Sequence, residues 1–482
     1  MSGAFTFYWH DYETFGKVPR RDRPSQFAGV RTDVDLNEIG EPLMQYCAPA
    51  PDYLPEPEAC LLTGILPQTC LEQGVPEHAF ASAIEHALAQ PNTVGVGYNT
   101  IRFDDEVTRH LFWRNLIDPY AREWQNGCGR WDLLDVVRTT WALRPEGIQW
   151  PKHDDGRPSF KLEHLTQANG LSHEAAHDAL SDVRATIALA RLLKQAQPRL
   201  WDFCLKLRQK SAVLAEAGLD QPRANWKPFL HISGMFSHER GCMALVWPLA
   251  QHPSNKNEVL VWDLAHDPSA LGGLSADDIR LRMFTKAADL PEGVTRLPIK
   301  TIHLNKSPMV VGNVNTLTPA LAQRWGIDLA QAAQHAEVAR ALPDMSGIWP
   351  AVFSRPAEAT PDVDQDLYGG FVGDRDRRLL NDLRTLSGDK LAKARANFDD
   401  PRLADLLWRY RARNFPQTLS PEEQERWEAH RAACLFDGQG GARTVEQLFT
   451  EIDTLSETAD DDRTQDILGA LYDYAEHIAP ER

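Results

Sequence analysis

The feature that most constrains the fold of this chain is a short apolar segment followed by two carboxylates. Residues 4–9 are mostly apolar and aromatic, which predicts a buried strand. Asp11 and Glu13 follow within the stretch 10–16 and are two residues apart. Because side chains alternate between the two faces of a strand, both carboxylates are expected to point the same way from the strand's end.

Two carboxylates held side by side repel each other unless a cation lies between them. Hard divalent ions such as Mg²⁺ prefer oxygen ligands of this kind. An isolated Asp-x-Glu is more often a polar strand end with two solvated acids, so the metal-site interpretation depends on further acids downstream.

The length and composition indicate a multidomain globular protein. A chain of 482 residues is too long for one compact core, so two or three domains are expected. No apolar run is long enough to span a membrane, and the N-terminus lacks the pattern of a signal peptide. The seven cysteines are scattered and form no Cys-x-x-Cys pair, which favours a reducing, cytoplasmic location over a zinc ribbon or a disulfide framework.

The formal net charge of −17 argues against a broad basic surface that binds nucleic acid. A narrow basic groove on an acidic body is compatible with this charge. The composition therefore makes nucleic-acid binding less expected without excluding it.

The first 200 residues alternate between predicted strands and helices. Strands are predicted over 26–33, 41–47 and 93–98, and helices over 77–90, 106–115, 131–143, 159–168 and 183–193. Three consecutive antiparallel strands at the start of an α/β domain are a first indication of its topology.

Further acids lie at the ends of these elements. Asp104 closes the pattern Asn-x-x-x-Phe-Asp between a strand and a helix, and Asp182 lies in an early helical turn, after His177 in the preceding loop. Each acid alone has a structural explanation, as a helix cap or as a charge near the positive end of a helix dipole. Asp105 and Asp178 are alternatives one residue or a few residues away.

The order Asp-x-Glu, Asn-x-x-x-Phe-Asp and His-x-x-x-x-Asp resembles the DEDD exonuclease superfamily, in its histidine-bearing branch. The resemblance implies an RNase H-like fold, in which helices flank a mixed sheet. It also implies roles for five residues: metal ligation by Asp11, Glu13, Asp104 and Asp182, and general-base catalysis by His177. Two metal ions roughly 4 Å apart would activate water and stabilise charge on the leaving oxygen of a phosphodiester. Imidazole suits a general base because its pKa lies near neutrality.

The remainder of the chain differs in pattern from the first domain. Residues 201–218 indicate a helix, residues 229–305 contain short β-like runs, and the chain after 362 is almost wholly helical. The predicted domains are 1–197, 198–350 and 351–482.

The resemblance becomes more specific over several stretches, and it runs essentially end to end. These stretches are 10–16, 97–109, 130–135, 159–170, 303–306 and 410–416. They resemble the bacterial exodeoxyribonuclease I family. The resemblance implies an exonuclease domain, an SH3-like domain and an all-α C-terminal domain around a groove for single-stranded DNA. It implies 3′–5′ degradation to 5′-mononucleotides in DNA repair and recombination, with two Mg²⁺ ions and Mn²⁺ as a substitute.

The same resemblance implies contact residues. Those expected to contact DNA are Glu13, Thr14, Leu62, Thr63, Ile65, Trp124, Arg138, Lys161, Asn305 and Lys306. Lys161 stands where the family more often has arginine, so a bidentate phosphate contact would be lost. Arg144 and Phe203 are expected to bind the C-terminal tail of single-stranded DNA-binding protein, although Thr318 replaces an expected arginine nearby.

Several alternatives remain open. Leu62 and Ile65 could be ordinary core residues, and Arg411 and Arg413 could either contact phosphates or pair with acids on neighbouring helices. The active-site residues do not separate an exodeoxyribonuclease from an exoribonuclease, because that choice depends on contacts to the 2′ position. A noncatalytic nucleic-acid-binding protein is a further alternative, which the four acids argue against. A monomer is expected.

Overall fold

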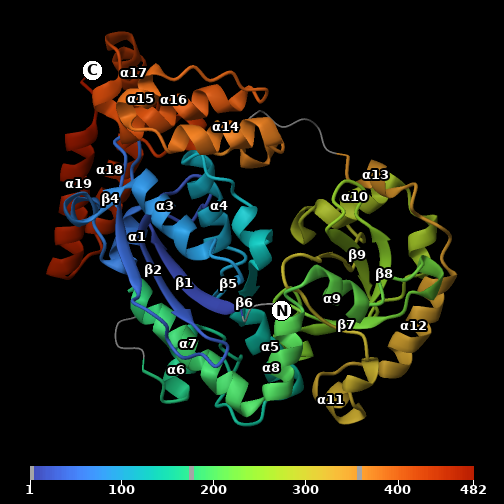
Figure 1. The fold of residues 1–482 in the computed structure, drawn as a ribbon. Helices are drawn as coiled ribbons and strands as arrows, with labels where there is room; N and C mark the ends of the chain where they lie inside the picture. The colour runs from blue at the N-terminus through green and yellow to red at the C-terminus, as the bar shows by residue number, and fades with distance from the viewer. Residues whose placement is uncertain (1–4, 173–177, 355–360, 482) are drawn as a thin grey trace. The chain divides into compact units, whose positions relative to one another are not determined.

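The structure, a computed structural model, describes residues 5–172, 178–354 and 361–481. Contacts within the chain divide it into two compact units (Figure 1). The first unit comprises Met1–Gly129, His173–Ile187 and Ala359–Arg482, and the second comprises Arg130–Ser172 and Ala188–Glu358. The N-terminal and C-terminal parts of the chain therefore belong to the same unit.

A mixed sheet forms the centre of the first unit, to which all of its strands but the last in the chain belong. In the described part of the chain it has six strands in the order β4-β3-β2-β1-β5-β6. The strands are β1 (Thr6–Thr14), β2 (Pro24–Thr32), β3 (Leu43–Ala48), β4 (Val75–Pro76), β5 (Thr93–Gly97) and β6 (Gly129–Asp132). β2 pairs antiparallel with both β1 and β3, whereas β5 runs parallel to β1. The predicted mixed sheet with three consecutive antiparallel strands is confirmed.

Strand β1 continues beyond its predicted end. Asp11 and Glu13 lie within the strand, opposite Ala28 and Gln26 of β2, and the pairing becomes irregular only after Glu13. The prediction that the carboxylates follow the strand was therefore wrong, because continued pairing with β2 keeps the backbone extended. Their placement on one face, which is the consequence that matters for chemistry, still holds.

Helices cover the sheet and carry two further acids. The helices of this region are α1 (Pro57–Thr63), α2 (Pro67–Gln73), α3 (Glu77–Leu88), α4 (Asp104–Arg114) and α7 (Ala179–Ala196). Tyr8, Tyr12 and Phe27 form one buried cluster with apolar residues of α3 and α4. Since Tyr8 and Tyr12 alternate with Asp11 and Glu13 along β1, the carboxylates lie on the opposite face of the sheet.

The second unit contains an antiparallel sheet. Within the described residues its strand order is β10-β9-β8-β7-β11. The strands are β7 (Phe229–Ile232), β8 (Met243–Gln251), β9 (Glu258–Asp263), β10 (Ile299–His303) and β11 (Met309–Val311). Its helices are α5 (Leu133–Leu143), α6 (Leu162–Ala168), α8 (Pro198–Lys206), α9 (Lys210–Glu216), α10 (Ala276–Phe284), α11 (Pro319–Arg324), α12 (Leu329–Ala341) and α13 (Trp349–Val352).

Two predicted helices of this region are shorter than expected. Residues 129–132 form β6, and α5 begins only at Leu133, where the Asp132 carboxylate accepts a hydrogen bond from the Leu134 backbone N–H at 2.9 Å. The helix predicted over 201–218 is divided into α8 and α9.

The C-terminal helices pack on the N-terminal part of the first unit. They are α14 (Asp374–Arg384), α15 (Gly388–Lys393), α16 (Arg402–Asn414), α17 (Pro421–Asp437), α18 (Val445–Ser456) and α19 (Asp462–Ile478). α18 and α19, drawn in red, lie beside α1 and share a buried core with Cys60, Ile65 and Cys70 (Figure 1).

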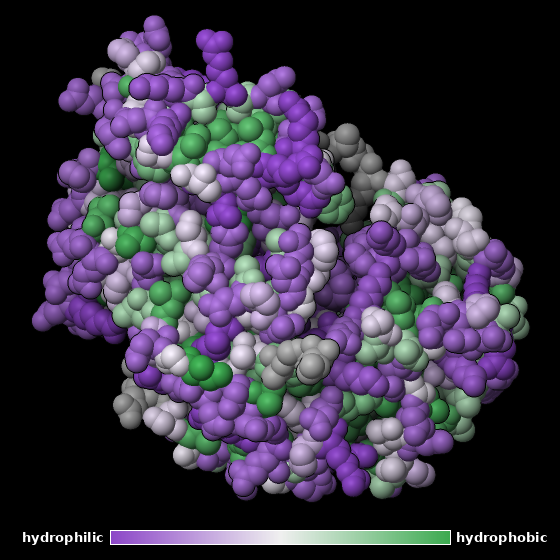
Figure 2. Space-filling view, viewed as in Figure 1, coloured by the Kyte–Doolittle hydropathy of each residue, from purple (hydrophilic) through white to green (hydrophobic). Residues whose placement is uncertain are grey.

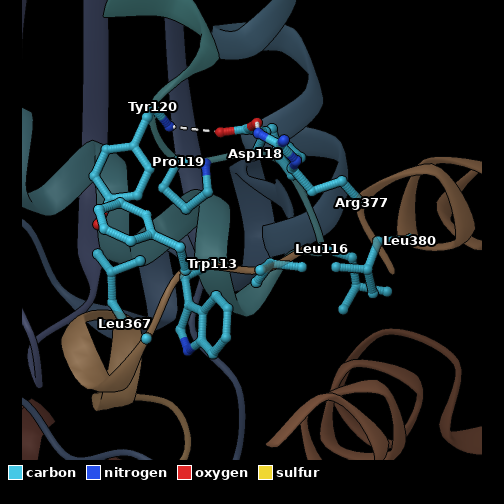
Figure 3. A pocket seen from close by; sticks show the side chains of 12 residues that line it. Trp113, Leu116, Asp118, Pro119, Tyr120, Leu367, Arg377 and Leu380 are labelled. Atoms are coloured by element: carbon cyan, nitrogen blue, oxygen red, sulfur yellow. Dashed lines mark hydrogen bonds and ion pairs between the residues drawn. The ribbon is translucent and has the colours of Figure 1, made fainter. Parts of the chain in front are cut away.

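A second contact between these parts surrounds a small pocket of about 50 Å³ (Figure 3). Trp113 and Leu116, at the end of α4, face Leu367 and Leu380 from the C-terminal part. The Trp113 indole N–H donates to the Val363 carbonyl at 2.8 Å. The N-terminal part of the first unit and the C-terminal helices therefore share more than one core.

The arginines of α16 are held by acids. Arg413, whose side chain is 5% exposed, donates to Asp52 Oδ2 at 2.7 Å and to Asp364 Oδ1 at 2.9 Å. Arg411 pairs with Glu423. Of the two alternatives for these arginines, the structure favours pairing with acids over contact with DNA phosphates.

Hydrophilic residues dominate the face of the molecule in Figure 2, with a hydrophobic area among the C-terminal helices at the top of the view. In the described ranges, no helix combines the length and the apolar character needed to cross a membrane.

Candidate active site

Three acids from two elements converge on one face of the mixed sheet. Asp11 and Glu13 come from β1, and Asp182 comes from the first turn of α7. One carboxylate oxygen from each of the three lies within 4.8 Å of the others. A single small cation could contact all three oxygens.

Asp104 adds a fourth acid beside this group. It is the first residue of α4, and its side chain is largely buried. Its Oδ1 accepts a hydrogen bond from the Tyr12 backbone N–H at 3.1 Å, which fixes the start of α4 against the middle of β1. The prediction that α4 begins only at residue 106 was therefore wrong by two residues, since Asp104 is already helical.

The electrostatics of the four acids are unfavourable without a cation. Burial, reinforced by the charges of Asp104, Glu13 and Asp182, raises the pKa of Asp11 well above its usual range. Burial and the charges of Asp182, Asp104 and Asp178 raise the pKa of Glu13 to about 8. Such mutual repulsion between buried carboxylates destabilises the fold, and a bound divalent cation relieves it. The donor set consists of oxygens alone, which suits Mg²⁺ or Mn²⁺.

The two neighbouring acids have other partners. Asp105 is almost completely buried and forms a 2.5 Å ion pair with Arg122. Asp178 accepts hydrogen bonds from the Gln26 side chain and from the Ser181 backbone N–H. Asp104 and Asp182 are therefore better placed than Asp105 and Asp178 to join Asp11. His177 lies outside the described residues.

The DNA-contact residues expected in the first unit differ in exposure. Leu62 and Trp124 are 58% and 64% exposed, which leaves the leucine side chain and the indole ring open to a ligand. Thr63 accepts a hydrogen bond from the Ile65 backbone N–H, and Thr14 donates to the Gly16 carbonyl.

Ile65 itself is 7% exposed and belongs to the core shared with α18 and α19. For this residue the structure favours the core alternative over direct contact with a base. Leu62, from the same segment, retains the exposed surface that such a contact requires.

The contact residues expected in the second unit lie on several elements. Arg138, on α5, lines a cavity of about 400 Å³ together with Phe160 and His238. Lys161 is exposed and donates to Glu163 at 3.1 Å. Asn305 and Lys306 occupy the turn between β10 and β11, where the Asn305 carbonyl accepts from Arg130 at 3.4 Å.

The residues expected to bind a partner tail lie in the same unit. Arg144 follows the end of α5 and is exposed, whereas Phe203 on α8 is partly buried. Thr318 is exposed and caps α11 by accepting a hydrogen bond from the Leu321 backbone N–H at 3.3 Å.

Two residues near the acids had no signal in the sequence. Arg122 holds Asp105, and Gln26 holds Asp178, which lies 152 positions away along the chain. Neither residue belongs to a local motif. Only the long-range pairing of strands and helices brings them to the site.

Three known families match most of the chain. Residues 8–190 match an exonuclease family, residues 208–355 the exonuclease I SH3-like domain, and residues 361–478 the exonuclease I C-terminal domain. The predicted order of an α/β exonuclease domain, an SH3-like domain and a helical C-terminal domain is confirmed.

Whole-length relatives are similar to this chain. Exodeoxyribonuclease I of Escherichia coli is 46% identical over 477 residues, which cover 98% of each chain. The structure of an exonuclease I from Methylocaldum szegediense gives a TM-score of 0.92 at 47% identity, covering 98% of this chain and 100% of that one. E. coli exonuclease I in complex with a dA16 oligonucleotide gives a TM-score of 0.90 at 45% identity, with 98% and 100% covered.

Proposed function

This chain belongs to the exodeoxyribonuclease I family, and from that premise we propose that it degrades single-stranded DNA from the 3′ end and releases 5′-mononucleotides. The observation that carries the proposal is the convergence of Asp11, Glu13 and Asp182 within 4.8 Å. Oxygen ligands gathered in this way serve phosphodiester hydrolysis with divalent ions.

The residues present fit a pair of divalent ions. Asp11, Glu13, Asp104 and Asp182 would hold two Mg²⁺ ions, for which Mn²⁺ would substitute. When bound, such ions lower the pKa of a water and stabilise charge on the leaving 3′ oxygen. His177 would take the proton from the attacking water, and its replacement by Ala should lower turnover by about 10²- to 10⁴-fold.

The proposed domains are residues 1–197, 198–350 and 351–482. Residues of the first two would hold the DNA. The exposed Leu62 and Trp124 would contact bases by apolar packing and stacking. Arg138, Lys161 and Lys306 would neutralise phosphates, which places local positive charge on a chain of net charge −17.

The two alternatives predict different substrates. An exoribonuclease of the same superfamily would degrade RNA, and the acids alone do not distinguish the sugars. A noncatalytic nucleic-acid-binding protein has no use for four acids that repel one another. The family relationship over the whole chain supports DNA as the substrate and hydrolysis as the activity.

Digestion of end-labelled single strands tests the function. DNA labelled at the 3′ end should lose its label at once in Mg²⁺, whereas 5′-labelled DNA should shorten progressively. EDTA should stop both reactions, and an RNA of the same sequence should survive. Preferential loss of RNA would favour the exoribonuclease, and binding without cleavage would favour the noncatalytic alternative.

The setting of this activity is DNA repair and recombination, in a cytoplasmic monomer. The free cysteines of the chain suit a reducing location. The acidic C-terminal tail of single-stranded DNA-binding protein would bind at Arg144 and Phe203. Titration of a labelled tail peptide should show weaker binding to Arg144→Ala than to the wild type, and equal binding would remove Arg144 from the partner site.

A further inference from the structure

Gln26 occupies the position on β2 directly opposite Glu13 on β1. Residues that face each other in an antiparallel pair project their side chains from the same face of the sheet. Gln26 therefore shares the face that carries Asp11 and Glu13. Its side chain is 1% exposed, so the amide must find its hydrogen-bond partners within the protein.

Both ends of the Gln26 amide contact the start of α7. Nε2 donates to Asp178 Oδ1 at 3.4 Å, and Oε1 accepts from the Ala179 backbone N–H at 3.1 Å. Ala179 is the first residue of α7, where backbone N–H groups have no acceptor within the helix. Gln26 thus joins strand β2 to the first turn of this helix.

Asp178 extends the connection to the acid of the active site. Its Oδ2 accepts from the Ser181 backbone N–H at 3.1 Å, and its carbonyl accepts from the Asp182 backbone N–H at 3.0 Å. The turn that carries Asp182 is therefore fixed to the same residue that Gln26 holds. Metal ligands must stay within about 0.5 Å of their productive positions, so a contact that fixes this turn also fixes the site.

We propose that Gln26 is a positioning residue, which sets the location of Asp182 relative to the two acids of β1 and thereby sets the affinity for the metal. The proposal rests on the proposed function of those acids. The competing explanation is that Gln26 only satisfies buried polar groups. That explanation predicts a loss of stability with unchanged metal binding.

The variant Gln26→Met removes the donor and the acceptor at nearly constant side-chain length. Its affinity for Mn²⁺, measured without DNA, and its kcat in Mg²⁺ should each fall about 10- to 100-fold. KM for single-stranded DNA should change less than about threefold, because Gln26 does not lie among the proposed DNA contacts.

Thr32→Val is the matched control. Thr32 lies on the same strand, is fully buried and accepts a hydrogen bond from the Trp9 indole at 2.9 Å, at the end of β2 remote from α7. This variant should lose thermal stability and keep the wild-type affinity for Mn²⁺. An equal loss of metal affinity in both variants would show that destabilising β2 is enough to weaken metal binding, and it would overturn the positioning role of Gln26.

An exchange of donor and acceptor provides a rescue experiment. Gln26→Glu keeps an acceptor for Ala179 but turns a second carboxylate toward Asp178, so Mn²⁺ affinity should fall. Adding Asp178→Asn restores a donor–acceptor pair with the net charge of the wild type, and affinity should recover. If Gln26→Met does not fold, Gln26→Glu and its combination with Asp178→Asn still test the positioning role of Gln26.

Wild-type Mn²⁺ affinity and kcat in folded Gln26→Met, or the absence of recovery in the double variant, would overturn the proposal. The Mn²⁺ comparison does not depend on cleavage. A wild type that binds Mn²⁺ through these acids but does not cleave DNA would therefore refute the proposed function while leaving the role of Gln26 testable.

Discussion

Arg122 donates a hydrogen bond to Asp105 across 2.5 Å, and both side chains are almost completely buried. This ion pair lies directly beside Asp104 in the first turn of α4. It gives Asp105 a structural role and leaves the adjacent carboxylate for the site. The pair thus supports the assignment of Asp104, which the motif Asn-x-x-x-Phe-Asp already favours over Asp105.

Removal of one partner of this pair should destabilise the first unit. Arg122→Met leaves the Asp105 carboxylate buried without a counter-charge, which costs about 3–5 kcal/mol. The unfolding midpoint in urea, followed by tryptophan fluorescence, measures the loss. Lys17→Met is the control, because the pair of Lys17 and Glu58 is 68% and 64% exposed and should contribute less than about 1 kcal/mol. Equal effects of the two variants would refute the importance of burial.

The metal-free protein should become more stable when Glu13 is replaced by Gln. The pKa of Glu13 rises from 4.5 to about 8 on folding, so its ionisation destabilises the native state increasingly from pH 4.5 to pH 8. With EDTA at pH 8, Glu13→Gln should melt roughly 2–4 °C above the wild type. The difference should vanish below pH 4.5, where Glu13 is protonated in both states.

Saturating Mg²⁺ should reverse this order, because a ligand that binds only the native state stabilises it. If the wild type melts above Glu13→Gln in EDTA at pH 8, repulsion among the acids does not destabilise the metal-free protein.

Arg413→Leu should affect stability rather than DNA binding. Arg413 is held between Asp52 and Asp364 in the first unit. Burial alone would raise the pKa of Asp52, but the Arg413 guanidinium, with His430 and Arg23, holds it well below the usual range. Loss of the guanidinium should cost about 3–5 kcal/mol in thermal or urea unfolding. Shorter runs of digestion at an unchanged melting temperature would instead place Arg413 on the DNA.

Lys306→Ala should reduce processivity. If Lys306 holds a phosphate remote from the cleaved bond, its loss should release shorter runs of nucleotides per encounter in the presence of excess trap DNA. The log–log slope of affinity against salt should become shallower by roughly 0.7. Lys286→Ala, an exposed lysine of the same unit, is the control and should behave as the wild type. Unchanged run length and salt slope would remove Lys306 from the DNA path.

The sequence was sufficient to bring Asp11 and Glu13 together, because they share a face through the two-residue period of a strand. Asp104 and Asp182 joined them as candidate ligands through the resemblance to a known superfamily, since a helix start alone also explains each of these acids. The order of these motifs also predicted the fold of the first domain, through the same resemblance. Element ends were less certain, since β1 continues through both acids and Trp131 belongs to a strand.

The residues that hold the surroundings of the acids in place could not be predicted, because their partners are distant in the chain. Gln26 and Asp178 are separated by 152 positions, and Arg413 and Asp52 by 361. Such pairs are formed by strand register and helix packing, which leave no periodic pattern in either segment. The burial of Ile65 has the same origin, because its neighbours in the core come from α18 and α19.

Binding of Mn²⁺ to the wild type and to Asp11→Asn, measured by electron paramagnetic resonance with thermal unfolding as the folding control, shows whether the acids form a metal site that serves cleavage. Asp11 lies among the other acids, so its carboxylate should be required for the site. We expect saturable Mn²⁺ binding by the wild type, loss of that binding in Asp11→Asn, and parallel loss of nucleotide release from 3′-labelled DNA. A folded Asp11→Asn variant that binds Mn²⁺ and cleaves DNA like the wild type would contradict this expectation.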